Sequence, residues 1–412
     1  MIAFNDACAI VANTPALGIE LVPLLAAEGR TLAELVTAPD DLVPYPRSAM
    51  DGFAVRAEDT HGAPLTLPIA AVAVYAEAGS LRHTPHTATT IATGGAIPTG
   101  ADAVIPVEDV FVSAEAIVVP RAIPVGHHIF PPGEDARAGQ ELVARDTLID
   151  PPALALLASA GITTIVAYRL PRVAVVTTGN ELVPFDEAPA HGQIRNSNGI
   201  AIAASLRAFG AGAVDLTTVA DDRDALLATL ARALAEADLT VVSGGASVGE
   251  RDYVKSVCDE LGVTFAFRSV ALRPARPSAF GRRGDAHIAL LPGNPAAAFV
   301  ALHEFVRPAV AALAGRSGDA MPRVSAILGG ELHARRGRTF AVYAQLRFIA
   351  GTFVATPLVN QCSALTRLGA EADAFVIVPP DADDLHPGAP VEVDVVSWRR
   401  VFSRVAHRME TR

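Results

Sequence analysis

The stretch "RVAVVTTGNELV", residues 172–183, decides the fold of the central part of the chain. It begins as a continuous apolar run that ends in Thr-Thr-Gly, the pattern of a buried parallel strand. Helix-like periods and further apolar runs alternate after it, as far as about residue 315. This alternation predicts a doubly wound α/β domain with a mostly parallel sheet. Ligands bind such sheets at the carboxyl ends of the strands, so we expect the site there.

The regions on either side of this domain have different patterns. Residues 48–132 hold short β-like runs separated by proline and glycine, which predicts an inserted β-rich domain. The first forty residues and residues 138–169 look helical, so we expect residues 1–47 and 133–170 to form one discontinuous helical domain. Residues 171–318 make up the α/β domain, and the β-like residues 319–398 predict a C-terminal β domain.

The composition excludes several classes of protein. A net charge of −11 over 412 residues, with no basic stripe, argues against a nucleic-acid partner. The chain is 51% hydrophobic, but its longest uncharged stretch, between Asp150 and Arg169, contains Gly161 and predicts a short helix, a turn and a strand. The N-terminus has no basic leader, so we expect a cytoplasmic protein. Three widely spaced cysteines predict reduced packing residues: Cys8, Cys258 and Cys362.

Acidic or glycine-rich turns follow four of the predicted strands in the α/β domain. They are "TTGNELV" with Glu181, "VADDRD" with Asp221 and Asp222, "SGGASVGERDY" with Ser243, Gly244, Gly245, Glu250 and Asp252, and "LPGNPAAA" with Pro292 and Pro295. A single acidic residue at such a place is most often a helix cap, with a stabilising effect of about 1 kcal/mol. Four such turns at one edge of one sheet predict a ligand site instead.

The glycines in "SGGASVGE" allow backbone N–H groups to converge on an anion. Carboxylates beside such an anion would repel it, unless a divalent cation or arginines neutralise them. Lys255 is the only lysine, so the charged candidates are arginines, and Arg273 and Arg276 in "RPARP" are held by prolines. Mg²⁺ suits oxygen ligands of this kind, whereas the scattered histidines and cysteines do not indicate zinc. Walker A and dinucleotide fingerprints do not occur.

Taken together, the motifs resemble those of the MoeA family of molybdenum insertases, which is related to the gephyrin E domain. They are "SAMDGFAVR", "ATGGAIPTGADAVIPVED", "PPGEDARAGQ", "TTGNELV", "GQIRNSNG", "SGGASVGERDYV", "RPARPSAFG" and "LPGNPAAAF", in this order over most of the chain. The resemblance implies an elongated homodimer of four-domain subunits, in which residues 1–47 and 133–170 dimerise. It also implies binding of adenylylated molybdopterin, release of AMP, transfer of molybdenum from molybdate, and a need for Mg²⁺.

The resemblance also implies roles for individual residues. Catalytic roles fall on Asp51, Asp135, Glu181 and Asp252. Metal ligands would come from Glu181, Asp221, Asp222 and Asp252. Substrate would be bound by Thr93, Ser243, Gly244, Gly245, Ser247, Arg273, Arg276, Pro292 and Pro295. The implied partners are the two substrates, a second subunit, and molybdoenzymes or the adenylyltransferase.

Asp51 has two interpretations. It lies outside the α/β domain, in a proline-marked loop, and from the residues alone a capping aspartate in a hinge is the simpler interpretation. The resemblance favours a site residue that reaches the α/β cleft of a neighbouring subunit, with Gly52 allowing a close backbone approach.

The sequence departs from the family pattern mainly at charged or hydroxylated positions. Basic or polar residues are usual at several of them, where this chain has Pro131, Pro132, Asn180, Ala275, Arg276, Tyr343, Cys362 and Ala364. Losing two or three anion contacts, each of about 1–3 kcal/mol, could weaken substrate binding by orders of magnitude. Two functions therefore stay open: an active insertase, and a divergent paralogue that binds molybdopterin or finished cofactor as a carrier or docking protein.

Overall fold

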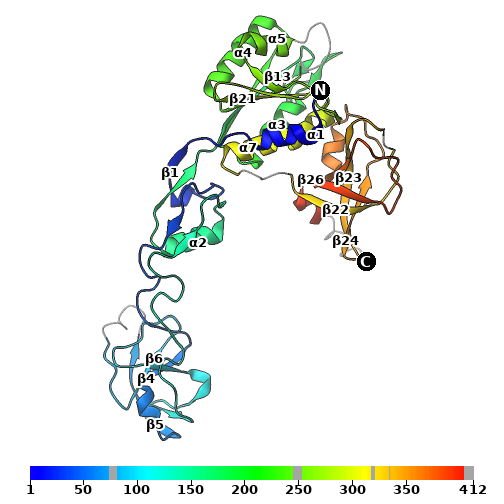
Figure 1. Cartoon of the computed structure of the whole chain (residues 1–412). Helices are drawn as coiled ribbons and strands as arrows, with labels where there is room; N and C mark the ends of the chain where they lie inside the picture. Colours follow the sequence, from blue (N-terminus) through cyan, green and yellow to red (C-terminus); the bar gives the residue numbers. More distant parts are fainter. Residues whose placement is uncertain (74–80, 245–252, 317–320, 334, 403–412) are drawn as a thin grey trace. The chain divides into compact units, whose positions relative to one another are not determined.

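A computed structural model of the chain describes residues 1–73, 81–244, 253–316, 321–333 and 335–402 (Figure 1). The chain divides into two compact units. The first contains Met1–Leu21, Gly29–Ala33 and Val166–Arg412, and the second contains Val22–Glu28 and Glu34–Ile165.

The central sheet of the first unit has the predicted, mostly parallel topology. Its strands run in the order β16 (Ala213–Val219), β13 (Arg172–Thr178), β17 (Leu239–Ser243), β21 (Ala286–Leu291), β20 (Ala279–Arg283) and β18 (Thr264–Phe267). The first four are parallel to one another, and the last two are antiparallel to their neighbours. The apolar run of residues 263–272 contains β18, in this sheet, and the first residue of β19 (Leu272–Arg273), in another.

Helices cover both faces of this sheet because successive strand residues point to opposite sides. Val175 and Val241 pack with α3 (Ser197–Ala208) and α6 (Pro295–Ala301), while their neighbours Val176 and Val242 pack on the other face. That second face carries α4 (Arg223–Glu236) and α5 (Tyr253–Glu260), as Figure 1 shows. Both faces are therefore buried, which explains the continuous apolar runs of the strands.

A long apolar helical stretch lies in the first unit. It consists of α6, a π-helical turn (Leu302–Val306) and α7 (Arg307–Leu313). By length and composition, Pro295–Leu313 is the one described helix that could cross a membrane, but 89% of its apolar window is buried in the protein. This stretch is therefore a core helix of the unit. Helix α1 (Phe4–Ala12) packs against it and adds Phe4, Ala7 and Val11 to the same core.

The C-terminal part of the first unit is a β-sheet that closes on itself. Its strands are β22 (Arg323–Leu328), β23 (Thr339–Ile349), β24 (Thr352–Pro357), β25 (Ala374–Val378) and β26 (Pro390–Val395), with α8 (Arg367–Glu371) between β24 and β25. The strand order is β23-β24-β22-β26-β25, and β25 pairs again with β23. The short strand β19 pairs with β23 and so connects this sheet to the α/β domain.

The second unit contains the predicted β-rich region. Its sheet has the order β7 (Ala103–Pro106), β4 (Gly52–Val55), β6 (Ala88–Ile91), β5 (Leu65–Ala73), β9 (Ala116–Val119) and β8 (Phe111–Val112). A second group of elements in this unit comprises α2 (Pro151–Ser159), β2 (Val36–Thr37), β3 (Arg47–Ser48), β10 (Ile129–Phe130) and β11 (Glu141–Val143).

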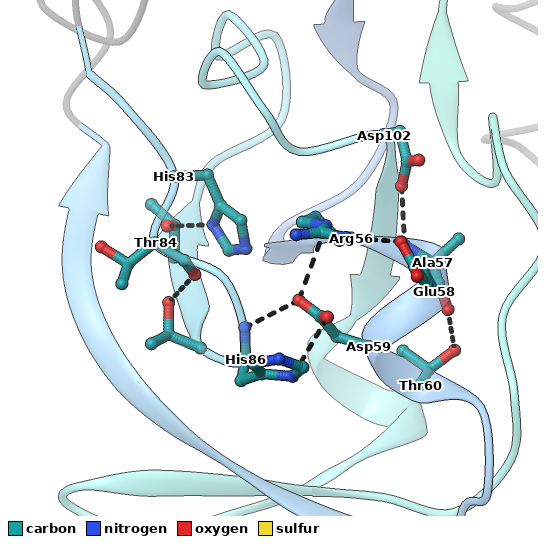
Figure 2. Close-up of polar contacts among 11 residues, drawn as sticks. Arg56, Ala57, Glu58, Asp59, Thr60, His83, Thr84, His86 and Asp102 are labelled. Atoms are coloured by element: carbon teal, nitrogen blue, oxygen red, sulfur yellow. Dashed lines mark hydrogen bonds and ion pairs between the residues drawn. The ribbon is translucent and has the colours of Figure 1, made fainter.

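A buried carboxylate organises one side of this β-rich region (Figure 2). Asp59, whose side chain is 1% exposed, accepts a hydrogen bond from the backbone N–H of His86 at 2.7 Å. It also pairs with the His86 ring at 3.1 Å and lies 3.9 Å from Arg56. Because a buried charge needs such partners, Asp59 fixes the loop that leads into β6. The burial of the neighbouring His83 ring lowers its pKa, so that ring stays neutral.

The helical prediction for residues 1–40 and 138–169 was wrong for much of these segments. Only Phe4–Ala12 and Pro151–Ser159 are α-helices, whereas β1 (Ile19–Pro23) and β12 (Thr164–Tyr168) are strands that pair with each other. The apolar spacing suggested helices, but β-branched residues and pairing partners far along the chain favour strands. The finer prediction of a helix, a turn and a strand between Asp150 and Arg169 is confirmed, and Gly161 adopts φ +73° at the turn.

The buried hydroxyl of Tyr343 is expected to stabilise the first unit. It is 1% exposed, and its hydroxyl donates to the backbone oxygen of Ala296 at 2.6 Å, which connects β23 to α6. We expect Tyr343→Phe to lower the free energy of unfolding by about 1–2 kcal/mol, because a buried acceptor loses its donor. Urea unfolding measures this change. Tyr45, 46% exposed in the second unit, supplies the control: Tyr45→Phe should change stability by less than about 0.5 kcal/mol. Equal effects of the two variants would contradict this role of the hydroxyl.

Candidate functional site

A polar cavity of about 600 Å³ lies at the carboxyl ends of the parallel strands in the first unit. The turns after β13, β16, β17 and β21 and the first residues of α3 and α6 form its walls. Among the predicted site residues, the cavity wall includes Glu181, Asp221, Ser243, Gly244, Pro292 and Pro295. The strand-end position expected from the sequence therefore coincides with a real cavity.

Asp221 is held in place by residues that follow β13. The Thr178 hydroxyl donates to its Oδ1 at 2.6 Å, and the backbone N–H of Asn180 approaches its Oδ2 at 3.4 Å. In return, the backbone N–H of Asp221 donates to Asn180 Oδ1 at 3.0 Å. Asn180, where an aspartate is commoner in similar sequences, thus keeps the acceptor and adds no negative charge.

Glu181 places a second carboxylate in the same cavity. Its carboxylate lies close to the backbone of Gly179. A Cβ atom on Gly179 would come within 2.8 Å of both Glu181 carboxylate oxygens. A side chain at position 179 would therefore displace this carboxylate.

The neighbouring Asp222 has a different position. Its Oδ1 accepts a hydrogen bond from the backbone N–H of Ala225 at 2.8 Å, so Asp222 caps the N-terminus of α4. It is not among the residues that line the cavity within the described part of the chain. Of the two adjacent aspartates, Asp221 is the one that lines the described cavity wall.

Asn198 connects the turns that follow β17 and β21. Its side-chain amide donates to Ser243 Oγ at 3.1 Å and to the backbone oxygen of Gly293 at 2.8 Å. Gly244 lies beside this contact with φ +103°, and a Cβ atom there would come within 2.2 Å of the Thr178 backbone oxygen. The ends of three strands therefore approach so closely that position 244 admits no side chain.

The N-terminus of α3 also faces the cavity. Asn196 caps this helix, accepting from the Gly199 N–H at 2.9 Å, and its amide donates to the hydroxyls of Thr177 and Thr218. Arg195, just before the cap, lines the cavity, and its Nε donates to the Glu187 backbone oxygen at 2.9 Å. Arg195, Asn196 and Asn198 were not among the predicted site residues, although all three belong to the motif "GQIRNSNG".

The charges that line the cavity are unequal. Among the described residues they are Glu181 and Asp221 against Arg195, so the wall carries one net negative charge. The described residues contain no group of three or more His, Cys, Asp or Glu side chains placed to hold a metal ion. Two carboxylates nevertheless fit Mg²⁺, which proteins commonly hold with one or two carboxylates together with phosphates of the substrate.

Other predicted residues lie in the second unit. Asp51 Oδ1 accepts hydrogen bonds from Thr93, at 2.7 Å from its backbone N–H and at 3.1 Å from its hydroxyl. The structure thus brings these two predicted residues together, and the Asp51 side chain is still exposed. Asp135 is exposed in the same unit. A joint site made with the cavity of another subunit stays a prediction.

Gly52 serves the sheet of its own unit. A Cβ atom at this position would lie 2.0 Å from the Ile105 backbone oxygen, because β4 and β7 pair closely there. The close backbone approach that we expected next to Asp51 is therefore an approach to the neighbouring strand.

The predicted anion-binding arginines, Arg273 and Arg276, are exposed and do not belong to the cavity wall in the described part of the chain. The Arg273 guanidinium lies 5.8 Å from the centre of the Phe340 ring. Between the two arginines in sequence, Ala275 adopts φ +90°, a backbone conformation that favours glycine. The predicted residues Gly245, Ser247 and Asp252 lie outside the described residues.

The other departures from the family pattern fall in different environments. Tyr343 is a buried core residue, whereas Pro131 and Pro132 are exposed in the second unit. Ala364 lines the cavity, and Cys362 is exposed nearby in sequence. Of these departures, Ala364 is the one that belongs to the described cavity wall, whereas Asn180 contacts the wall residue Asp221.

Three family models match successive parts of the chain. They are the MoeA N-terminal region (domains I and II) at residues 2–161, a probable molybdopterin-binding domain at residues 174–312, and the MoeA C-terminal region (domain IV) at residues 325–396. The second match covers the α/β domain that contains the cavity.

Relatives and a solved structure match this chain over most of their own length. The molybdopterin molybdenumtransferase 2 of Mycobacterium tuberculosis is 35% identical over 383 residues, which cover 90% of this chain and 94% of that protein. The molybdopterin molybdenumtransferase of Bacillus subtilis is 31% identical and covers 88% of this chain and 86% of its own. A crystal structure of the molybdopterin biosynthesis MoeA protein from Pyrococcus horikoshii superimposes on this chain with a TM-score of 0.80 at 29% sequence identity. The match covers 96% of this chain and 99% of that protein.

The close contact at Gly244 predicts the effect of adding one methyl group. We expect Gly244→Ala to lower the free energy of unfolding of the first unit by about 3 kcal/mol, because the methyl group meets a backbone oxygen and φ is positive. Gly293→Ala is the matched control, since its Cβ atom would lie 3.5 Å from the Gly244 Cα, an ordinary contact. Urea unfolding distinguishes the two variants. If Gly244→Ala is as stable as Gly293→Ala, the strand ends are not packed as described.

Proposed function

This chain belongs to the MoeA family, and on that premise we propose that it acts as a molybdopterin molybdenumtransferase in molybdenum cofactor biosynthesis. It would bind adenylylated molybdopterin and molybdate, insert molybdenum into the dithiolene, and release AMP by hydrolysis of the phosphoanhydride. One observation carries the proposal: a cavity of ligand size at the sheet edge combines two carboxylates with the N-terminus of a 12-residue helix.

The residues of the cavity suit a substrate with linked phosphates. The free N–H groups at the start of α3 and the Arg195 guanidinium favour an anion. Glu181 and Asp221 would hold Mg²⁺ by their carboxylates, with phosphate oxygens completing its ligands. When bound, Mg²⁺ neutralises phosphate charge and polarises the phosphoryl oxygens. The hydrogen bond from the Thr178 hydroxyl would hold the Asp221 carboxylate in one orientation for binding Mg²⁺.

The second unit would complete the site from a partner subunit. Asp51 is exposed, but its orientation is fixed by two hydrogen bonds from Thr93. An exposed, oriented carboxylate fits a residue that meets a ligand held elsewhere. We therefore propose a cytoplasmic homodimer in which Asp51 and Asp135 of one subunit face the cavity of the other.

Substitutions of the adjacent residues Asp221 and Asp222 test whether the cavity is the site of AMP release. We expect Asp221→Asn to reduce AMP release from adenylylated molybdopterin at least 100-fold, because one of two charges available to Mg²⁺ is lost. The Mg²⁺ concentration that gives half-maximal release should rise as well. Release of AMP is measured by liquid chromatography in the presence of molybdate and Mg²⁺.

Asp222→Asn is the control for this experiment. Asparagine caps a helix as well as aspartate does, so the variant should fold and release AMP at a rate close to that of the unmodified protein. Equal losses in both variants would contradict the assignment of the cavity. If the unmodified protein binds molybdopterin tightly but releases no AMP, the alternative function, a non-catalytic carrier, is correct.

A further inference from the structure

The side chain of Gln361 ties the loop after β24 to the C-terminal sheet. Strand β24 ends at Pro357, and the backbone N–H of Leu358 still donates to the Tyr343 backbone oxygen at 2.8 Å. Further along the loop, Gln361 Oε1 accepts from the Tyr343 backbone N–H at 3.0 Å, and Gln361 Nε2 donates to the Tyr343 backbone oxygen at 3.0 Å. The side-chain amide therefore takes the place of a strand residue opposite Tyr343, on the side where β24 has ended.

The same amide also holds the start of its own loop. Gln361 Nε2 donates to the backbone oxygen of Leu358 at 2.8 Å, so both polar atoms of the side chain are engaged. Gln361 is nevertheless an exposed residue, and exposed glutamines ordinarily bond to water. This side chain is therefore fixed to the backbone at two residues, Tyr343 on β23 and Leu358 in the loop.

Helix α6 holds the loop at a second place. The backbone N–H of Ala296 donates to the Ser363 backbone oxygen at 3.0 Å, and Asn294 Nδ2 approaches Ser363 Oγ at 3.4 Å. The backbone oxygen of Ala296 in turn accepts from the Tyr343 hydroxyl at 2.6 Å. These contacts form a closed ring, because Ser363 lies two residues after Gln361 in the same loop. Tyr343 is its centre, with its backbone on Gln361 and its hydroxyl on α6.

The ring lies beside the polar cavity. Asn294 and Pro295, at the start of α6, line the cavity, and so do Ala364 and Thr366 of the loop. Residues 359–366 are exposed apart from the half-buried Ser363, so side-chain packing contributes little to the position of the loop. A segment with so little burial opens easily unless hydrogen bonds hold it. The ring therefore decides where the wall residues Ala364 and Thr366 lie.

We propose that Gln361 is a positioning residue of the cavity, which keeps the wall residues of the loop in place. This inference rests on the proposed function. Gln361 is not among the residues that line the cavity in the described part of the chain, so it acts through Ala364 and Thr366. Wall contacts of this kind bind the substrate and the transition state alike, so their loss raises KM and leaves kcat unchanged.

Truncation of the amide tests this role against a matched control on β23. Gln345 is half-buried on the same strand as Tyr343 and lies outside the described cavity wall. We expect Gln361→Ala to raise KM for adenylylated molybdopterin about tenfold in the AMP-release assay, while kcat stays within about threefold. Gln345→Ala should change neither constant. A fall in kcat at unchanged KM in Gln361→Ala would contradict a positioning role.

Hydrogen exchange of residues 358–366, followed by mass spectrometry, measures the loop itself. Gln361→Ala should speed the exchange of these amides about tenfold or more, and Gln345→Ala should leave it unchanged. If exchange is equal in the two variants, Gln361 does not hold the loop. If exchange is faster in Gln361→Ala but KM is unchanged, the loop does not position the wall, and our inference is wrong.

Gln361→Glu adds a pH profile that simple destabilisation would not produce. At pH 8 its carboxylate accepts from the Tyr343 N–H but has no hydrogen to donate to the backbone oxygens of Tyr343 and Leu358. Those oxygens disfavour the charged form and raise the pKa of the new carboxyl above its ordinary value of about 4.3. Between pH 8 and pH 5, molybdopterin binding by Gln361→Glu should therefore recover about threefold or more relative to the unmodified protein.

Gln361→Ala has no titrating group at this position and should show no such recovery. A deficit of Gln361→Glu that is the same at pH 5 and pH 8 would contradict the hydrogen bonds as its cause. Molybdopterin binding and hydrogen exchange are both measured without turnover. The absence of AMP release from the unmodified protein would therefore refute the proposed function alone, and these two measurements would still decide the role of Gln361.

Discussion

The site depends on the close approach of three strand ends in the parallel sheet. Gly244 has no side chain, so its backbone lies against the Thr178 carbonyl, and Asn198 ties the turns after β17 and β21 together. Thr178 in turn orients Asp221 through its hydroxyl. The strand-end packing that requires glycine at position 244 therefore involves the same residue, Thr178, that orients the Asp221 carboxylate in the cavity.

Charge balance limits what this cavity can bind. The described part of the wall, with two carboxylates and one arginine, opposes a phosphate ligand unless a cation accompanies it. Asn180 reduces this opposition, since an aspartate there would add a third negative charge beside Asp221. Asparagine at position 180 thus fits a site that binds anions, whereas Tyr343 is a packing residue between the C-terminal sheet and α6.

An apolar pocket of about 240 Å³ adjoins the polar cavity, and the two spaces share helix α3. Helix α3 belongs to both, with its capped N-terminus towards the polar space and Ala201 and Ile202 towards the apolar one. A single helix can do this because residues a few positions apart lie on different parts of its surface. The same helix therefore forms part of the boundary between the two spaces.

The amino-acid sequence determined the α/β alternation, the mostly parallel sheet and the turns that hold Glu181, Asp221 and Gly244, because these follow from local periodicity and strand ends. It could not separate Asp221 from Asp222, since both follow β16 and only the start of α4 decides which one caps a helix. Strands β1 and β12 depend on partners distant in the chain, and the walls contributed by Arg195, Asn198 and Thr366 meet only after folding. These features are long-range, and local patterns carry no information about them.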